Sequence, residues 1–163
     1  MQFQNIRESI LIVDFGSQVT KLIARRIRDL GVFSEIVTPN KINSINNFDK
    51  FKGIILSGGP STVTKQKFQS IPKIIFSKNI PILGICYGLQ LIAKLFGGKI
   101  KSSKKRREFG RAIIFRKKKS LLLKNFFRSN QSVWMSHEDA VVKLPKNFVV
   151  TAYTKDSKLT AIE

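Results

Sequence analysis

Residues 81–90 read PILGICYGLQ, and this stretch decides how the chain is interpreted. The apolar run after Pro81 predicts a buried strand and residues 89–96 predict a helix, so Cys86 falls on the turn between them. In the pattern G-x-C-x-G, glycines on either side of a nucleophile relieve crowding in a sharp strand-to-helix turn. The helix would also direct its first N–H groups at the sulfur and favour the thiolate. Cys86 is therefore a candidate nucleophile, or alternatively a small buried hydrophobe, as most free cysteines are.

Composition indicates one globular domain. The 163 residues, 42% of them hydrophobic, are enough for a core without disulfides, and a single cysteine suits a reducing compartment. Residues 1–9 are polar and do not resemble a signal peptide, and no apolar run is long enough to cross a bilayer. We therefore predict a cytoplasmic protein without a membrane partner.

The net charge of +20 would ordinarily suggest a nucleic-acid partner. The lysines are scattered, however, and the sequence contains neither a basic helix interleaved with aromatics nor zinc-ligand spacing. Enrichment in Ile, Asn and Phe points instead to a codon bias toward A and T. We predict no specific nucleic-acid partner. The basic run at residues 104–107 is interpreted as a solvated loop rather than a phosphate-binding patch.

The first half of the chain has the order of an open, doubly wound α/β sheet that is mixed but mainly parallel. Apolar runs predict strands at residues 10–13, 33–37 and 53–56. A helix is predicted from an N-cap at Ser17 to a stop at Gly31, and a short helix at residues 71–77. The second half is predicted to form a meander, with strands at residues 109–115, 133–135, 148–154 and 159–162 and a bridge at 120–127.

Three loops leave the carboxyl ends of the predicted strands, at Asp14, Ser57 and Cys86, and are expected to converge where open α/β sheets bind ligands. Residues 57–61, SGGPS, would present unshielded backbone N–H groups to an oxyanion. The alternative is that they form an ordinary turn.

Several motifs in this order resemble the class I, triad-type glutamine amidotransferases, in particular the amidotransferase domain of the GMP synthase family. They lie at residues 14–18, 55–60, 84–90, 107–110 and 133–137. The resemblance covers nearly the whole chain, so we treat residues 1–163 as one amidotransferase domain. It implies that Cys86 attacks the side-chain amide of glutamine and forms a thioester.

The resemblance also implies roles for the neighbouring residues. The amides of Gly59 and Tyr87 would hold the oxyanion, and the glutamine would be positioned by Gly58, Gln90, Ser136 and His137. Glu138 stands where the family usually has a small residue, which puts that edge of the pocket in doubt.

The family's catalytic histidine and glutamate come from a His-Pro-Glu segment that this sequence does not contain. His137 is the only histidine, and an alternative triad of Cys86, His137 and Asp139 is less favoured than a substrate-binding role for His137. We therefore expect the domain to be incomplete at its C-terminus, and efficient turnover is not expected from this chain alone.

The function implied is glutamine hydrolysis that supplies ammonia for amination of XMP to GMP. The ATP-pyrophosphatase domain, with its ATP and Mg²⁺, would be a fused or separate partner, and the full-length enzyme would be a homodimer. No cofactor is expected on this chain. Two alternatives are an amidotransferase serving another acceptor and a noncatalytic relic of the domain.

Overall fold

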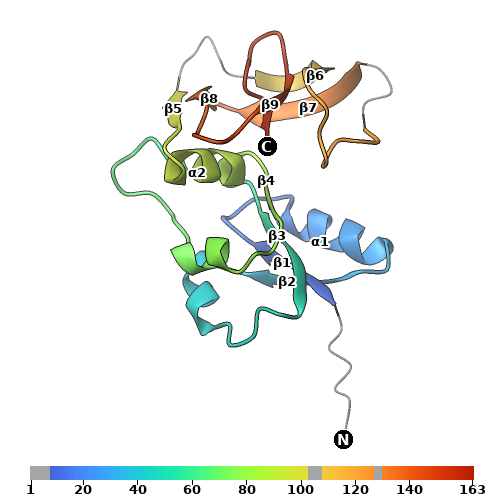
Figure 1. Cartoon of the computed structure of the whole chain (residues 1–163), viewed down its shortest axis with the longest axis vertical. Coiled ribbons are helices and arrows are strands. Elements are labelled where there is room, and N and C mark those ends of the chain that lie inside the picture. Colours follow the sequence, from blue (N-terminus) through green and yellow to red (C-terminus); the bar gives the residue numbers. More distant parts are fainter. Residues whose placement is uncertain (1–7, 103–107, 127–129) are drawn as a thin grey trace, which may run out of the picture. The chain divides into compact units, whose positions relative to one another are not determined.

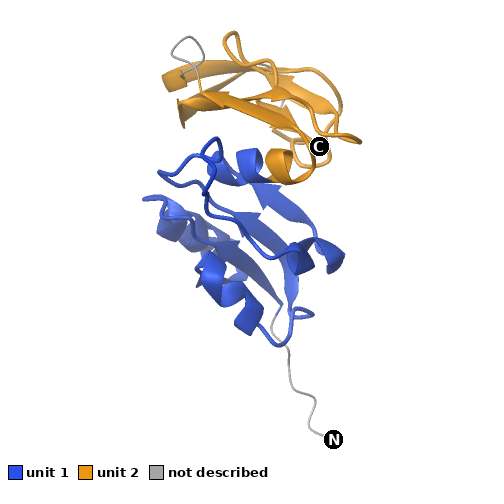
Figure 2. Cartoon of the chain, turned by 90° about the vertical axis from the view of Figure 1, so that its left-hand side faces the viewer, with its two compact units in different colours: residues 1–91 blue, residues 92–163 orange. Residues whose placement is uncertain are grey.

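The computed structural model describes residues 8–102, 108–126 and 130–163. These residues divide into two compact units, residues 1–91 and 92–163, which Figure 2 colours separately. The predicted loop at residues 104–107 lies outside the described residues. No helix in the described part of the chain is long and apolar enough to span a membrane.

Unit 1 is built on a four-stranded parallel sheet. Its strands are β1 (Ser9–Val13), β2 (Phe33–Val37), β3 (Phe51–Leu56) and β4 (Ile82–Gly84), in the order β2-β1-β3-β4 (Figure 1). Leu11, Ile12 and Val13 are fully buried, as expected of a strand covered on both faces. The predicted α/β class and parallel sheet are confirmed.

The helices of unit 1 connect these strands. Helix α1 (Thr20–Asp29) follows β1, and two short 3₁₀ helices, η1 (Pro39–Ser44) and η2 (Lys73–Ser77), precede β3 and β4. The N-cap of α1 is Val19, so the prediction of Ser17 is wrong: the Ser17 hydroxyl accepts the Val19 N–H (3.3 Å) in a turn before the helix. Gly31 ends the segment as predicted, with a φ of +81° that suits glycine.

Unit 2 is antiparallel. One sheet has the order β10-β9-β6-β7, with β6 (Glu108–Arg116), β7 (Gln131–His137), β9 (Val150–Tyr153) and β10 (Ala161–Ile162). Strands β5 (Lys99–Ser102) and β8 (Asp139–Lys143) form a second pair. Helix α2 (Tyr87–Leu95) begins in unit 1 and ends in unit 2. The meander was predicted, whereas β5 and β8 were not.

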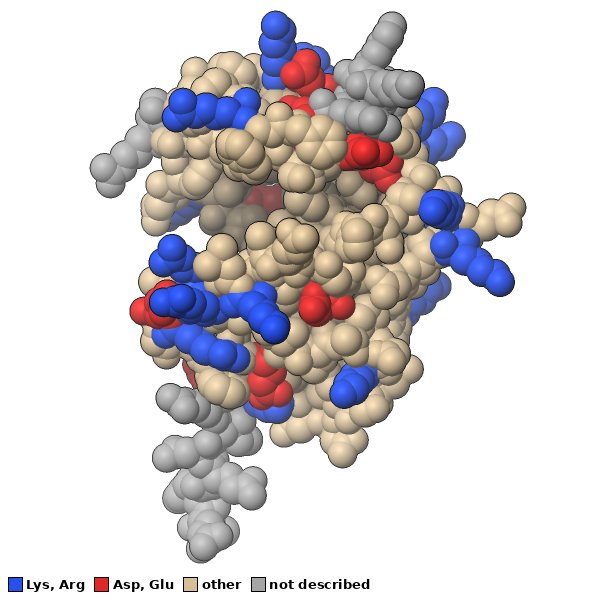
Figure 3. Space-filling model, turned by 180° about the vertical axis from the view of Figure 1, so that it is seen from behind, with Lys and Arg blue, Asp and Glu red and all other residues tan. Residues whose placement is uncertain are grey.

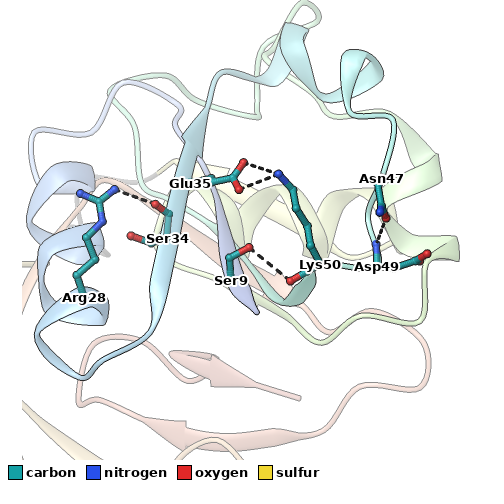
Figure 4. A network of polar contacts seen from close by, with 7 residues as sticks. All are labelled: Ser9, Arg28, Ser34, Glu35, Asn47, Asp49 and Lys50. Atoms are coloured by element: carbon teal, nitrogen blue, oxygen red, sulfur yellow. Dashed lines mark hydrogen bonds and ion pairs between the residues drawn. The ribbon is translucent and has the colours of Figure 1, made fainter. Parts of the chain in front are cut away.

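A polar network ties β2 to the turn before β3 (Figure 4). The Lys50 ammonium lies 2.8 and 3.0 Å from the two carboxylate oxygens of Glu35, and the Ser9 hydroxyl donates to the Lys50 carbonyl. Nearby, the Arg28 guanidinium donates to the Ser34 carbonyl (2.8 Å), which joins α1 to β2.

The Glu35–Lys50 ion pair is expected to contribute little to stability. Both side chains are about one third exposed, and such a pair is typically worth about 0.2–1 kcal/mol and is screened by salt. We expect Glu35→Gln to lower the free energy of unfolding by less than about 1 kcal/mol, and 1 M NaCl to shrink the difference. Urea denaturation of both proteins at low and high salt measures this. A larger, salt-independent loss would show that the carboxylate supports the fold in another way.

Candidate functional site

Cys86 lies on a strained turn between β4 and α2, with a φ of +48°. Both flanking glycines are sterically required. A Cβ on Gly84 would lie 2.6 Å from the Gly88 carbonyl carbon, and a Cβ on Gly88 would lie 2.2 Å from the Leu56 carbonyl oxygen. This confirms that the glycines of G-x-C-x-G relieve crowding. The helix starts at Tyr87, directly after the cysteine and two residues earlier than predicted.

Neighbouring bonds hold the turn in place. The Ile85 N–H donates to the Leu56 carbonyl (2.9 Å) and the Gly88 N–H donates to the Ser57 carbonyl (3.1 Å). The Tyr87 ring is buried against Phe15 at a centroid distance of 4.9 Å, and its hydroxyl donates to the Gln69 carbonyl (2.5 Å). The backbone of the cysteine is therefore constrained on both sides.

The glycine loop after β3 lies against this turn. A Cβ on Gly58 would lie 3.6 Å from the Cys86 Cβ and 3.6 Å from the Ser17 hydroxyl oxygen. A Cβ on Gly59 would lie only 2.5 Å from the Phe15 carbonyl oxygen. The loops after β1, β3 and β4 thus meet, as predicted, at the carboxyl ends of the strands. Strand order reverses between β1 and β3, which is where sheets of this type bind ligands.

Ser57 ties the three loops together, a role that sequence reasoning did not assign. Its side chain is fully buried, and its hydroxyl accepts the Phe15 N–H (3.2 Å) and donates to the Gly58 carbonyl (2.8 Å). The only sign of this role in the sequence is that Ser57 comes directly after an apolar strand. Ser57 therefore fixes the path of the glycine loop beside the cysteine.

The N–H groups predicted to bind an oxyanion are available. Among the described residues, neither the Gly59 N–H nor the Tyr87 N–H donates a backbone hydrogen bond. Tyr87 is the first residue of α2, where N–H groups have no partner within the helix. Both N–H groups are therefore free to donate to a ligand.

The surroundings of Cys86 disfavour the charged form of its thiol. Cys86 is exposed at the surface of unit 1, yet the protein atoms around it replace enough water for burial to raise the pKa of the thiol. The predicted effect of the helix on the thiolate is therefore opposed by desolvation, which disfavours the charged form.

This pKa shift predicts the pH dependence of alkylation. Because only the thiolate reacts, the rate with iodoacetamide should reach half its maximum at a higher pH in the native chain than in the chain unfolded in urea. The two pH–rate profiles, measured by mass spectrometry, test this directly. A native midpoint at or below the unfolded one would mean that the helix dipole outweighs burial.

The remaining candidates divide between the units. Gln90 lies in α2 within unit 1 and is buried, with 8% of its surface exposed. Ser136 and His137 end β7 in unit 2. The His137 Nε2 lies 3.0 Å from the Glu108 Oε2, so Glu108 is a carboxylate that contacts this ring. The sequence motif at residues 107–110 contained Glu108, but no role was predicted for it.

No group of three or more His, Cys, Asp or Glu among the described residues is arranged to hold a metal ion. On the face drawn in Figure 3, lysine and arginine side chains lie at several separate places, with acidic side chains among them.

The fold and site together define the class of protein: a parallel α/β sheet presents a thiol on a crowded strand-to-helix turn, beside unshielded backbone amides. The family model "Glutamine amidotransferase class-I" matches residues 11–163. The chain belongs to the class I glutamine amidotransferase family. Its sequence is homologous to the amidotransferase part of GMP synthases.

Curated relatives and solved structures agree with this assignment. GMP synthase (glutamine-hydrolyzing) of Treponema denticola is 48% identical over 160 residues, covering 98% of this chain and 30% of that protein. The Chlorobium limicola enzyme is also 48% identical, covering 96% of this chain and 31% of that protein. The chain therefore spans less than a third of these relatives.

A crystal structure from Thermoplasma acidophilum, of a protein described as part of a GMP synthase, has a TM-score of 0.83 at 33% identity. The match covers 96% of this chain and 78% of that one. A glutamine amidotransferase of Thermotoga maritima, at 17% identity and a TM-score of 0.74, supports the fold alone; it covers 96% of this chain and 74% of that one.

Proposed function

We propose that this chain is the glutamine-hydrolysing part of a GMP synthase, with Cys86 as its nucleophile. The observation that carries the proposal is the turn itself: a strained cysteine between two glycines that admit no side chain, in a chain 48% identical to GMP synthases. Such turns hold a nucleophile clear of the sheet, where a substrate carbonyl can reach it.

The proposed reaction is acyl transfer. The Cys86 sulfur attacks the side-chain amide carbon of glutamine, and a C–S bond forms as the carbonyl oxygen becomes an oxyanion. The N–H groups of Gly59 and Tyr87 would bind this oxyanion, each contributing about 3–4 kcal/mol by analogy with other acyl-transfer sites. When the C–N bond breaks, the nitrogen gains a proton and leaves as ammonia. Water then hydrolyses the thioester to glutamate.

The resemblance implies that Gly58, Gln90, Ser136 and His137 would bind the substrate. Glu138 replaces a residue that is usually small in the family, and its larger side chain would alter that edge of the glutamine site.

Proton transfer is the step that this sequence supports least. Burial raises the pKa of the Cys86 thiol, so the sulfur is largely protonated near neutral pH and must lose its proton before it attacks. We therefore expect the rate of acylation to rise with pH as the thiolate forms.

The ammonia would be used by an ATP-pyrophosphatase domain that activates XMP and aminates it to GMP. ATP and Mg²⁺ would bind to that domain. We place this chemistry in the cytoplasm, with a homodimer as the assembly of the complete enzyme.

A diazo-ketone analogue of glutamine tests the proposal. It should label Cys86 with saturation kinetics, and L-glutamine but not L-asparagine should protect, since asparagine is one methylene shorter. Labelling that neither saturates nor responds to glutamine, in a chain that still folds, would contradict the proposal.

A further inference from the structure

One face of the hairpin formed by β6 and β7, within unit 2, presents large apolar side chains to solvent. Trp134 is 79% exposed, Phe109 62% and Ile113 44%. The solvent face of an antiparallel sheet is ordinarily polar, and the core of this unit lies on the other face, where Ile114 packs with Val133. A continuous apolar patch of this kind indicates a surface that binds another molecule.

The strand register places these side chains next to one another. Strands β6 and β7 run side by side (Figure 1), with Trp134 directly opposite Arg111 and with Phe109 and Ile113 as its diagonal neighbours. Diagonal neighbours on one face of an antiparallel pair lie about 7–8 Å apart, within reach of aromatic side chains. Phe109 and Trp134 therefore form two neighbouring ring platforms with a guanidinium group beside them.

The aromatic row continues onto β9. Because side chains alternate along a strand, Phe115 lies on the same face of β6 as Phe109. Phe115 is the cross-strand partner of Tyr153, and the two rings stack at a centroid distance of 5.4 Å. The Lys158 ammonium lies 5.7 Å from the centroid of the Tyr153 ring. Three strands thus contribute aromatic rings to this face, and cations lie beside them.

The charges along this face are positive. Arg111 is exposed, and its Nε donates to the Ser132 hydroxyl (3.0 Å), which orients the guanidinium and leaves its terminal nitrogens for a phosphate. The end of β6 and the residues after it add four exposed basic side chains, at residues 116–119. No acidic residue occupies the outward positions of β6 and β7, which are residues 109, 111, 113, 115, 132, 134 and 136.

We propose that this face binds single-stranded nucleic acid without regard to base sequence, with bases stacked on Trp134 and Phe109 and a phosphate held by Arg111. Aromatic rings accept the flat face of any base, and basic side chains follow the phosphates. The net charge of +20 supplies the long-range attraction. The inference goes beyond the proposed function and does not involve Cys86. Local sequence patterns do not reveal such a face, because cross-strand register assembles it.

The fluorescence of Trp134 tests the proposal directly, because it is the only tryptophan. An oligothymidylate of about 12 nucleotides should quench it with a saturable dependence on concentration. A duplex of the same length should bind about tenfold more weakly, because its bases are already stacked on one another. Sodium polyphosphate carries the charges without the bases and should not quench. Raising NaCl from about 50 to about 200 mM should weaken binding of the oligothymidylate.

Substitutions separate stacking from charge. Phe109→Ala leaves the net charge unchanged and should weaken binding about tenfold. Leu30→Ala is the matched control, because Leu30 is an apolar side chain of unit 1 with 82% exposure, and it should bind as the wild type does. Arg111→Ala should lower the slope of log affinity against log salt by about 0.7. Trp134→Ala, followed by the anisotropy of a fluorescent oligothymidylate, should also bind about tenfold more weakly.

Several results would overturn the inference. They are a wild-type chain whose fluorescence is not quenched, a duplex or polyphosphate that quenches as strongly as the oligothymidylate, and a Phe109→Ala chain that binds normally. A blue shift of Trp134 emission with rising protein concentration alone would show that a second copy covers the face instead. Cys86→Ala should bind the oligothymidylate like the wild type, so this test and that of the proposed function fail separately.

Discussion

Gly88→Ala is expected to destabilise the chain by about 3 kcal/mol and to slow acylation of Cys86 about 100-fold. The added methyl group would lie 2.2 Å from the Leu56 carbonyl oxygen, which is backbone and cannot rotate away. Either β3 or the start of α2 must shift, and the cysteine shifts with them. Thermal unfolding followed by circular dichroism and the labelling rate with the diazo-ketone measure the two effects.

Gly31→Ala is the matched control for backbone strain. Gly31 has a positive φ of +81°, unlike Gly88, and a Cβ there would meet nothing within 4 Å, so its substitution adds backbone strain without a close approach. Strain alone should cost about 1 kcal/mol and leave labelling unchanged. If Gly88→Ala and Gly31→Ala lower stability and the labelling rate equally, the close contact between Gly88 and the Leu56 carbonyl oxygen does not hold the turn.

Gly59→Ala is expected to reduce the maximal acylation rate by about 100-fold or more. Its methyl group would lie 2.5 Å from the Phe15 carbonyl oxygen and 2.9 Å from the Phe15 Cβ, so the loop and its N–H must move. The lost donor serves only the oxyanion. The concentration for half-maximal labelling should therefore change much less than the rate.

Gly58→Ala provides the contrast. A methyl group there would make ordinary contacts at 3.6 Å with Cys86 and Ser17, so the loop can stay in place. It would occupy space beside the sulfur and weaken binding of the analogue instead. If Gly59→Ala weakens binding and Gly58→Ala lowers the maximal rate, the assigned roles of the two glycines are wrong.

The central features of unit 1 were predictable because their causes are local. A strand buried on both faces must be a continuous apolar run, as at β1 and β3. A nucleophile on a tight turn needs small neighbours, which Gly84 and Gly88 supply. Convergence of the three loops then follows from parallel strand order.

Other features depend on contacts distant in the sequence. Strand β5 consists largely of exposed residues with two lysines, which are depleted in strands, and it exists because it pairs with β8. The contact between Glu108 and His137 depends on the register of β6 and β7, which periodicity within one segment does not specify. The predicted start of α1 was too early, because the Ser17 hydroxyl accepts a hydrogen bond within the turn that precedes the helix and not from the helix itself.

The most direct test of the account is the intact mass of the chain after incubation with L-glutamine and quenching in acid. We predict an adduct equal to one glutamyl group on Cys86, because the acid quench traps the thioester that the sulfur forms with glutamine. It should disappear on treatment with hydroxylamine and be absent from Cys86→Ala. A folded chain that reacts with iodoacetamide but shows no glutamyl adduct at any time would contradict the assignment of Cys86 as the glutamine nucleophile.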